Sequence, residues 1–237
     1  MPSLPRWCRH ILPDPTQLSV REQLRSSLGA LIGLLVTAAI AWFAIGDTAG
    51  LPLLIAPMGA SAVLLFGVPA SPLAQPWPLV GGNLVGALAG VGCACLIPIP
   101  LVAAAAAVAA TVLLMFVLRC VHPPSGAVAI TAVLGGTSIH ALGYAFLLYP
   151  VGINSLALVA SAVVYHRLTG HTYPHRAKAR TPVPDDRATK TITRTELDAL
   201  LRNRAEILDV DVGDLEWFLE ELARKSEQRR EKVSHLA

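Results

Sequence analysis

The stretch Arg119–Ala127, RCVHPPSGA, is a short polar interruption in a long and almost entirely apolar part of the sequence. Its two consecutive prolines lack backbone N–H donors and push the residue before them out of helical geometry, so we expect a helix to end near Arg119. Ser125 and Gly126 then allow a new helix to begin, with Ser125 as its cap. A helix start beside a histidine and an arginine favours an anion, because free N–H groups point at it.

Arg119 and Asp47 are the two formally charged residues between Ser26 and Tyr165. An ionisable group at membrane depth is costly, so Arg119 and the nearby His122 are candidate ligand-binding residues. The alternative is structural: the His122 ring N–H caps the preceding helix, and Arg119 reaches the lipid headgroups. The structural role is favoured for Arg119 and the functional role for His122.

A second copy of the pattern lies 67 residues earlier, since Pro57–Ala62 and Pro124–Ala129 both read P-x-G-A-x-A. Each copy stands between two long apolar runs. Paired interruptions at corresponding positions of two halves indicate a transporter-type binding site. The candidate substrate-binding residues are Pro57, Gly59, Ser61, Asn83, Arg119, His122, Ser125 and Gly126.

The composition excludes an ordinary soluble domain, because 54% of the residues are apolar, 15% are charged and the mean hydropathy is +0.56. Six apolar runs, at about residues 27–45, 51–68, 79–97, 101–119, 125–139 and 143–165, predict membrane spans. The predicted fold class is an all-α, polytopic membrane helical bundle with a short soluble helical tail. Three spans per repeat is an odd number, so the two repeats would be inverted. Four spans result if runs two and five are re-entrant.

The third run carries Gly82, Gly86 and Gly90 on one helix face. Small residues at this spacing allow another helix to approach closely, which is the favoured interpretation. The alternative is that this face lines a path, with Asn83 as its polar group.

Four regions follow from charge and composition: a basic leader (1–26), the transmembrane domain (27–166), a linker (167–192) and an amphipathic helical tail (193–237). We expect both termini to be cytoplasmic, in a bacterial inner membrane, because Lys and Arg gather beside the first and last spans. The short tail helices bury little surface alone, so we expect the tail to pack on a partner copy, as a homo-oligomer contact, or on the membrane domain. The lipid bilayer is the other expected partner.

Several functions are disfavoured by the same residues. The charges after Tyr165 are mixed in sign and form no basic stripe, so we expect no nucleic acid. The spans hold no paired carboxylates, and the serine and histidine candidates lack an orienting third group, so we expect no catalytic residues and no enzyme. Cysteine spacing gives no zinc site, and we expect no metal or cofactor.

Three blocks, beginning at Pro57, Ser71 and His122, resemble the HPP family of integral membrane proteins: PMGASAVLLFG, SPLAQP and HPPSGA. The resemblance covers roughly residues 21–167. Plant plastid and cyanobacterial members are implicated in nitrite transport, so the resemblance implies a small-anion transporter or channel. Two positions depart from the family pattern, where Trp77 replaces a frequent basic residue and Asn83 a frequent histidine.

The tail resembles a helical linker that leads, in some bacterial relatives, into nucleotide-sensing cystathionine-β-synthase-type domains. The sequence stops at Ala237 before such a domain, which indicates a cut chain or a relative without its sensor. The favoured hypothesis is passage of a small monovalent, nitrite-like anion between the repeats, held by helix-start N–H groups and serine hydroxyls. An ordinary histidine titrates near pH 6.5, so His122 would couple the anion to a proton. The alternative is a membrane-anchored assembly or regulatory protein acting through its tail.

Overall fold

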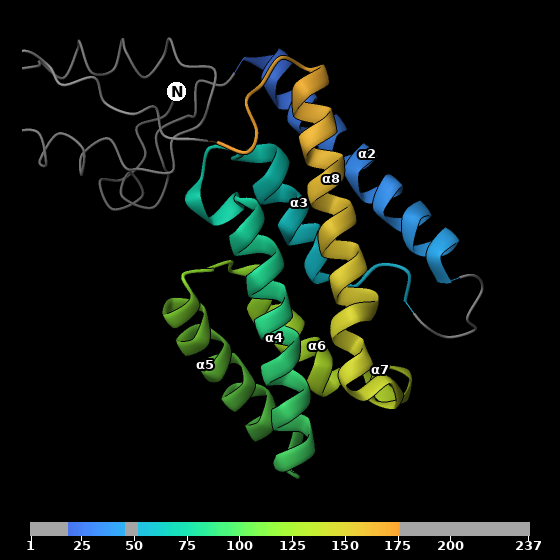
Figure 1. Ribbon diagram of the computed structural model, residues 1–237, viewed down its shortest axis with the longest axis vertical. Coiled ribbons are helices and arrows are strands. Elements are labelled where there is room, and N and C mark those ends of the chain that lie inside the picture. Colours follow the sequence, from blue (N-terminus) through green and yellow to red (C-terminus); the bar gives the residue numbers. More distant parts are fainter. Residues whose placement is uncertain (1–18, 46–51, 176–237) are drawn as a thin grey trace, which may run out of the picture.

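The chain forms a bundle of helices, with no β-strand among residues 19–45 and 52–175, the parts that the computed structural model describes (Figure 1). Four apolar helical stretches are long enough to cross a membrane: Val20–Ala44, Pro76–Leu96, Pro100–Leu118 and Gly136–Leu168. Two shorter apolar helices, Pro57–Gly67 (α3) and Pro124–Leu134 (α6), have 11 residues each. The predicted all-α membrane bundle is confirmed, whereas the described residues contain four helices of spanning length rather than six.

The two short helices differ from the predicted spans two and five. Residues 53–56 lie within predicted span two but are not helical. The prolines Pro52 and Pro57 lack the N–H groups that a longer helix needs. α6 ends at Leu134, and Gly136 adopts a positive φ of 80° before a separate short helix, Gly136–Leu142 (α7). The spans predicted at 51–68 and 125–139 are therefore shorter helices. Non-helical residues precede the first, and a break at Gly135 and Gly136 follows the second.

The remaining long helices follow the apolar runs with shifted ends. Helix α2 (Val20–Ile45) begins seven residues before its predicted range, and α5 (Pro100–Leu118) lies one residue from its predicted range. Helix α4 (Pro76–Leu96) takes in two prolines assigned to the preceding loop, because the first turn of a helix needs no N–H donors. The rest of that loop contains the short turn Pro72–Ala74 (η1).

The last span begins later than predicted. Two short turns, Gly143–Leu147 (η2) and Leu148–Gly152 (η3), precede α8 (Ile153–Leu168). Tyr149 has an extended backbone (φ −136°, ψ 129°), the conformation favoured for a residue before proline. The predicted span at 143–165 is therefore a shorter helix with an irregular lead-in.

The main helices follow the same order in both halves: a long helix, an 11-residue helix that begins with Pro, and a third helix. In the second half, α7, η2 and η3 precede the third helix. The packing also repeats. α2 packs on α3, and the corresponding helices α5 and α6 also pack on each other. α4 packs on both α5 and α6 of the other half, and α8 packs likewise on both α2 and α3. Exchanging α2–α3–α4 with α5–α6–α8 therefore leaves the pattern of neighbours unchanged, which supports the predicted repeat.

The two halves run in opposite directions. α6 is parallel to α4, because Gly82 lies beside Ser125 and Gly90 lies beside Ala132. α3 is parallel to α8, because the Leu65 carbonyl near the end of α3 contacts His166 near the end of α8. α4 and α8 are antiparallel, since the start of α4 meets the chain that follows α8 (Figure 1). This is the arrangement of inverted repeats.

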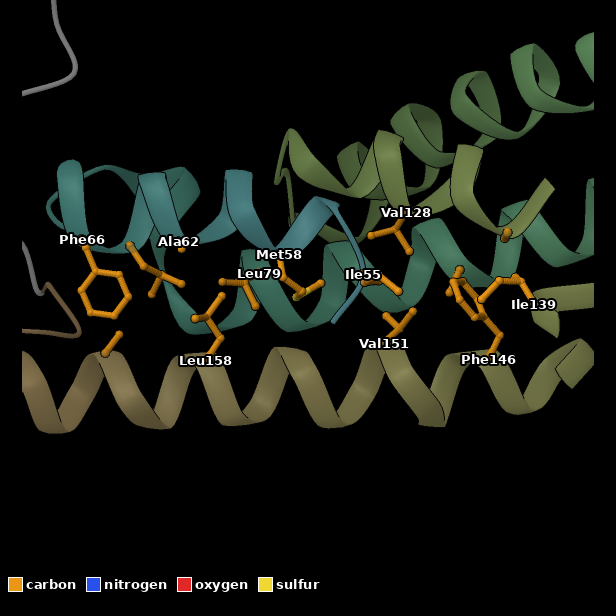
Figure 2. Packing of buried hydrophobic residues seen from close by; sticks show 14 of the residues in the cluster. Ile55, Met58, Ala62, Phe66, Leu79, Val128, Ile139, Phe146, Val151 and Leu158 are labelled. Atoms are coloured by element: carbon orange, nitrogen blue, oxygen red, sulfur yellow. The ribbon is translucent and has the colours of Figure 1, made fainter. Parts of the chain in front are cut away.

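Apolar side chains from α3, α4, α6 and α8 meet in the interior of the bundle, as Figure 2 shows for Met58, Leu79, Val128 and Leu158. Burying apolar groups gives little free energy inside a lipid bilayer, so close van der Waals packing holds such helices together. α2 and α5 leave most of their apolar surface exposed, which is the surface that meets lipid acyl chains. The expected contact with the bilayer follows from this arrangement.

Some predictions concern residues outside the described parts of the chain. These are the leader up to residue 18, Asp47, and the linker and tail from residue 176 onward. The proposed oligomer contact in the tail stays a prediction, as do the four domain boundaries.

Candidate functional site

The turn between α5 and α6 places His122 in the interior. Arg119 ends α5 in the left-handed conformation (φ 54°, ψ 42°), with its N–H bonded to Phe116 O at 3.3 Å and the Cys120 N–H to Met115 O at 2.9 Å. These two bonds form a Schellman motif, which satisfies carbonyls at the end of a helix. The chain then leaves the helix axis and carries His122 inward, toward α3 and η1.

The His122 ring joins three segments of the chain. Its Nδ1 atom lies 2.8 Å from the carbonyl oxygen of Leu73 in η1, and its Nε2 atom lies 2.9 Å from the Ser61 hydroxyl in α3. Because a carbonyl only accepts, Nδ1 carries the hydrogen and donates it. In the neutral ring, Nε2 accepts the hydrogen of the Ser61 hydroxyl. His122 and Ser61 are both fully buried.

The starts of α3 and α6 have the same hydrogen bonds at a spacing of 67 residues. The N–H groups of Met58 and Gly59 donate to the carbonyls of Ile55 and Ala56. The corresponding N–H groups in α6 do the same, since Ser125 N–H donates to His122 O and Gly126 N–H to Pro123 O. These bonds satisfy donors that a helix start would otherwise leave open. The expected free N–H groups at these four residues are therefore occupied, which corrects the predicted anion contact.

Asn83 connects three helices in the interior. Its Oδ1 atom accepts from the Ser125 hydroxyl of α6 at 3.0 Å, and its Nδ2 group donates to the Ser155 hydroxyl of α8 at 3.0 Å. All three side chains are fully buried. The structure thus brings the predicted residues Asn83 and Ser125 together, and it adds Ser155. The sequence analysis did not include Ser155, and its position beside Asn154 in an apolar helix was the one sequence signal that could have identified it.

The Gly82, Gly86 and Gly90 face of α4 packs against α6. A Cβ atom at Gly90 would lie 2.7 Å from Ala129 O and 2.6 Å from the Ala132 Cβ. At Gly82 it would lie 2.8 Å from Cys120 O. The favoured packing role of these glycines is confirmed by this close approach, and Asn83 lies among them as a buried connector.

The remaining predicted residues, Arg119, Pro57, Gly59 and Gly126, make no hydrogen bond to the His122 ring. The Arg119 side chain is exposed at the end of α5, and Pro57 is buried at the start of α3. A Cβ atom at Gly59 would meet nothing within 4 Å, and one at Gly126 would meet only Val108, at 3.9 Å. The first turn of each short helix therefore has room beside its repeated glycine.

A second polar cluster, which the sequence reading did not identify, lies where α2 begins and α8 ends. The His166 Nε2 atom lies 2.9 Å from Leu65 O, and its Nδ1 atom lies 3.3 Å from Nη1 of Arg25. Arg25 also pairs with Glu22, and His171 lies 3.6 Å from the same carboxylate. The cluster joins the first and last helices at one end of the bundle. Across residues 19–45 and 52–175, no three metal-binding side chains form a metal site.

These features define the class of the protein: a polytopic membrane protein built from two inverted halves, each with a proline-started short helix. Residues 15–174 match the family described as "HPP, transmembrane region", which covers more than half of the chain. The chain therefore belongs to the HPP transmembrane family, as its three sequence blocks predicted.

Two relatives are transmembrane proteins of Dictyostelium discoideum. One is 34% identical over 152 residues, which is 62% of this chain and 53% of the relative. The other is 32% identical over 155 residues, which is 64% of this chain and 49% of the relative. The match thus spans about half the length of each relative. No solved structure matches the chain.

Proposed function

We propose that this protein moves a small monovalent anion across the membrane between its two repeats, and that His122 and Ser61 couple this movement to a proton. One observation carries the proposal: a fully buried imidazole and a fully buried hydroxyl are 2.9 Å apart where the two short helices meet. An ionisable side chain kept inside a membrane bundle is a functional hypothesis by default.

The direction of the Ser61–His122 hydrogen bond depends on the proton. With a neutral ring, the Ser61 hydrogen is directed at Nε2 and is not available to a ligand. With a protonated ring, Nε2 becomes a donor and the Ser61 oxygen becomes its acceptor. The Ser61 hydrogen is then released to bind an anion, and the positive imidazolium lies beside it. One proton thus creates both a donor and a favourable charge.

Space for the anion is proposed beside the first turns of α3 and α6. Both helix starts carry a partial positive charge, which favours an anion. The complete burial of His122 fits a closed state, since a transporter site is sealed from at least one side at any time. Arg119 is exposed, so its charge acts on the site only through a screened field.

Nitrite is the first anion to test, because the sequence blocks resemble a family with members implicated in nitrite transport. The proposal requires no covalent chemistry, since the Ser61 hydroxyl and the protonated His122 ring replace part of the hydration shell. We place both ends of the described chain on the cytoplasmic side of a bacterial inner membrane. The contact of Arg25 with His166 supports a common side, and the basic residues around it support the cytoplasm.

The test is uptake into proteoliposomes of nitrite, nitrate, formate and chloride, each across a series from about pH 8 down to about pH 4, because burial disfavours the charged form of an imidazole. The proteins are the wild type, His122→Ala, Arg119→Ala and a control, His140→Ala. His140 lies in α7, outside the site, and its ring bonds to Val133 O. We expect uptake at the lower pH values that is lost in His122→Ala and kept in His140→Ala. Folded wild-type protein that takes up none of the four anions would overturn the proposal.

A further inference from the structure

The segment after α8 folds back over the start of α4. Tyr173 is only 3% exposed, and its hydroxyl donates to the carbonyl oxygen of Ala74 at 2.8 Å. The backbone N–H of His175 donates to Oε1 of Gln75 at 2.9 Å. Residues 169–175 are therefore attached to η1 and to the residue that follows it.

His122 also makes a hydrogen bond to η1. The Leu73 carbonyl accepts from the His122 ring, and the adjacent Ala74 carbonyl accepts from Tyr173. The two acceptors belong to consecutive residues of one short turn, so the turn connects the segment after α8 with the buried imidazole. The φ and ψ dihedrals of Ala74 lie between the two carbonyls, and the hydrogen bond from the Ala74 N–H to Ser71 O at 3.0 Å restrains them. A displacement of the turn therefore moves both acceptors together.

Gln75 and Ser71 make this turn rigid. The Gln75 amide donates to Pro69 O at 3.0 Å and to Ser71 O at 2.8 Å, while its Oε1 atom accepts from His175. The Ser71 hydroxyl accepts from the Leu73 N–H at 3.3 Å. A turn with this much internal hydrogen bonding transmits a movement of residues 169–175 to its carbonyl groups rather than absorbing it.

We propose that Tyr173 is a positioning residue for His122: it holds the Ala74 carbonyl, and through η1 it fixes the Leu73 carbonyl that orients the imidazole. Burial raises the pKa of the Tyr173 phenol, which keeps it a donor at physiological pH.

The test compares Tyr173→Phe with Tyr165→Phe. Each removes one hydroxyl that donates to a backbone carbonyl, but Tyr165 bonds to Arg25 O in α2 at 2.7 Å rather than to η1. The primary measurement is the nitrogen NMR signal of the His122 ring in histidine-labelled full-length protein, assigned with His122→Gln. We expect Tyr173→Phe to shift the Nδ1 resonance, because the Leu73 acceptor moves, and Tyr165→Phe to leave it in place.

A second variant keeps the proposal testable if Tyr173→Phe does not fold. Gln75→Met keeps the length of the side chain but removes its bonds to Pro69, Ser71 and His175, and we expect the same Nδ1 shift. An unchanged His122 signal in the folded variants would overturn the inference. So would a shift of equal size in Tyr165→Phe.

The role of Tyr173 in transport rests on the proposed function, but the NMR signal does not. If the wild type takes up an anion, we expect Tyr173→Phe to raise its KM about fivefold, the loss expected for one hydrogen bond. If the wild type takes up none, the transport proposal fails, and a shifted His122 signal still supports the structural link. The two failures are therefore distinguishable.

Discussion

The Ser61 hydroxyl of α3 lies 2.9 Å from the His122 Nε2 atom, although 61 residues separate them in the chain. This contact joins the short helix of the first repeat to the residue that precedes the short helix of the second. Ile55 occupies the position of His122 in the first repeat, since both residues accept the first cap bond of their helix. The two repeats share the backbone hydrogen bonds at the start of their short helices, and the second repeat has the titratable side chain of His122 where the first has Ile55.

We predict that Ser61→Ala weakens the dependence of anion uptake on pH. Protonation of His122 still adds a positive charge, but it no longer releases the serine hydroxyl as a donor, so uptake at low pH falls toward its value at high pH. The variant also leaves buried Nε2 without its partner, at a cost of about 1–3 kcal/mol in the free energy of unfolding. Initial uptake rates across a pH series, with thermal unfolding in detergent, measure both effects.

Ser161→Ala is the matched control for this prediction. The Ser161 hydroxyl donates to Ala157 O of its own helix at 2.8 Å and does not contact His122. Its removal is expected to leave the pH dependence intact. A Ser61→Ala protein with the pH profile of the wild type would exclude the hydroxyl switch.

We predict that Asn83→Leu destabilises the bundle more than replacement of an isolated polar residue does. Leucine is close to asparagine in size but leaves the Ser125 and Ser155 hydroxyls without their partner. Each unpaired buried group costs about 1–3 kcal/mol. Unfolding of Asn83→Leu, Ser125→Ala and the double variant forms a cycle that isolates the coupling of the pair. Strict additivity would show that the two side chains do not act as a unit.

We predict opposite outcomes for alanine at two glycines of α4. At Gly86 a Cβ atom would overlap the backbone carbonyl of Ser125, which cannot move without displacing the start of α6. At Gly92 the nearest atom is the Tyr144 hydroxyl at 4.0 Å. Gly86→Ala is therefore expected to lower the unfolding temperature by several degrees, while Gly92→Ala raises it or leaves it unchanged, because alanine favours a helix by about 1 kcal/mol. Comparable losses in both variants would contradict the close packing of α4 on α6.

The helices that the sequence predicted best are those bounded by proline. α4 and α5 begin at Pro76 and Pro100, within three residues of expectation, because proline fits only the first turn of a helix. The irregular lead-in to α8 was not predicted, since an apolar run with Gly and Pro inside it is also compatible with a kinked helix.

The candidate site was predicted in part for a similar reason. Asn83, Ser61, Ser125 and His122 stand out as polar residues in apolar runs, and all four proved to be buried. Their pairing depends on contacts between residues 42 and 61 positions apart, which local patterns do not encode. Arg119 lies three residues from His122 in sequence, yet the left-handed turn at Arg119 leaves one side chain exposed and the other buried.

The last prediction separates a structural from a ligand-binding role for Arg119. Its left-handed backbone costs a non-glycine residue about 1 kcal/mol or more, and glycine is the residue that usually occupies this position of a Schellman motif. Arg119→Gly is therefore expected to raise the unfolding temperature by a few degrees, whereas Arg119→Ala keeps the unfavourable backbone and gives no such gain. If Arg119 acts mainly in ending α5, both variants transport anions at the wild-type rate. If its charge is needed at the site, both variants lose uptake equally despite their different stabilities. The Arg119 side chain would then leave its exposed position during transport.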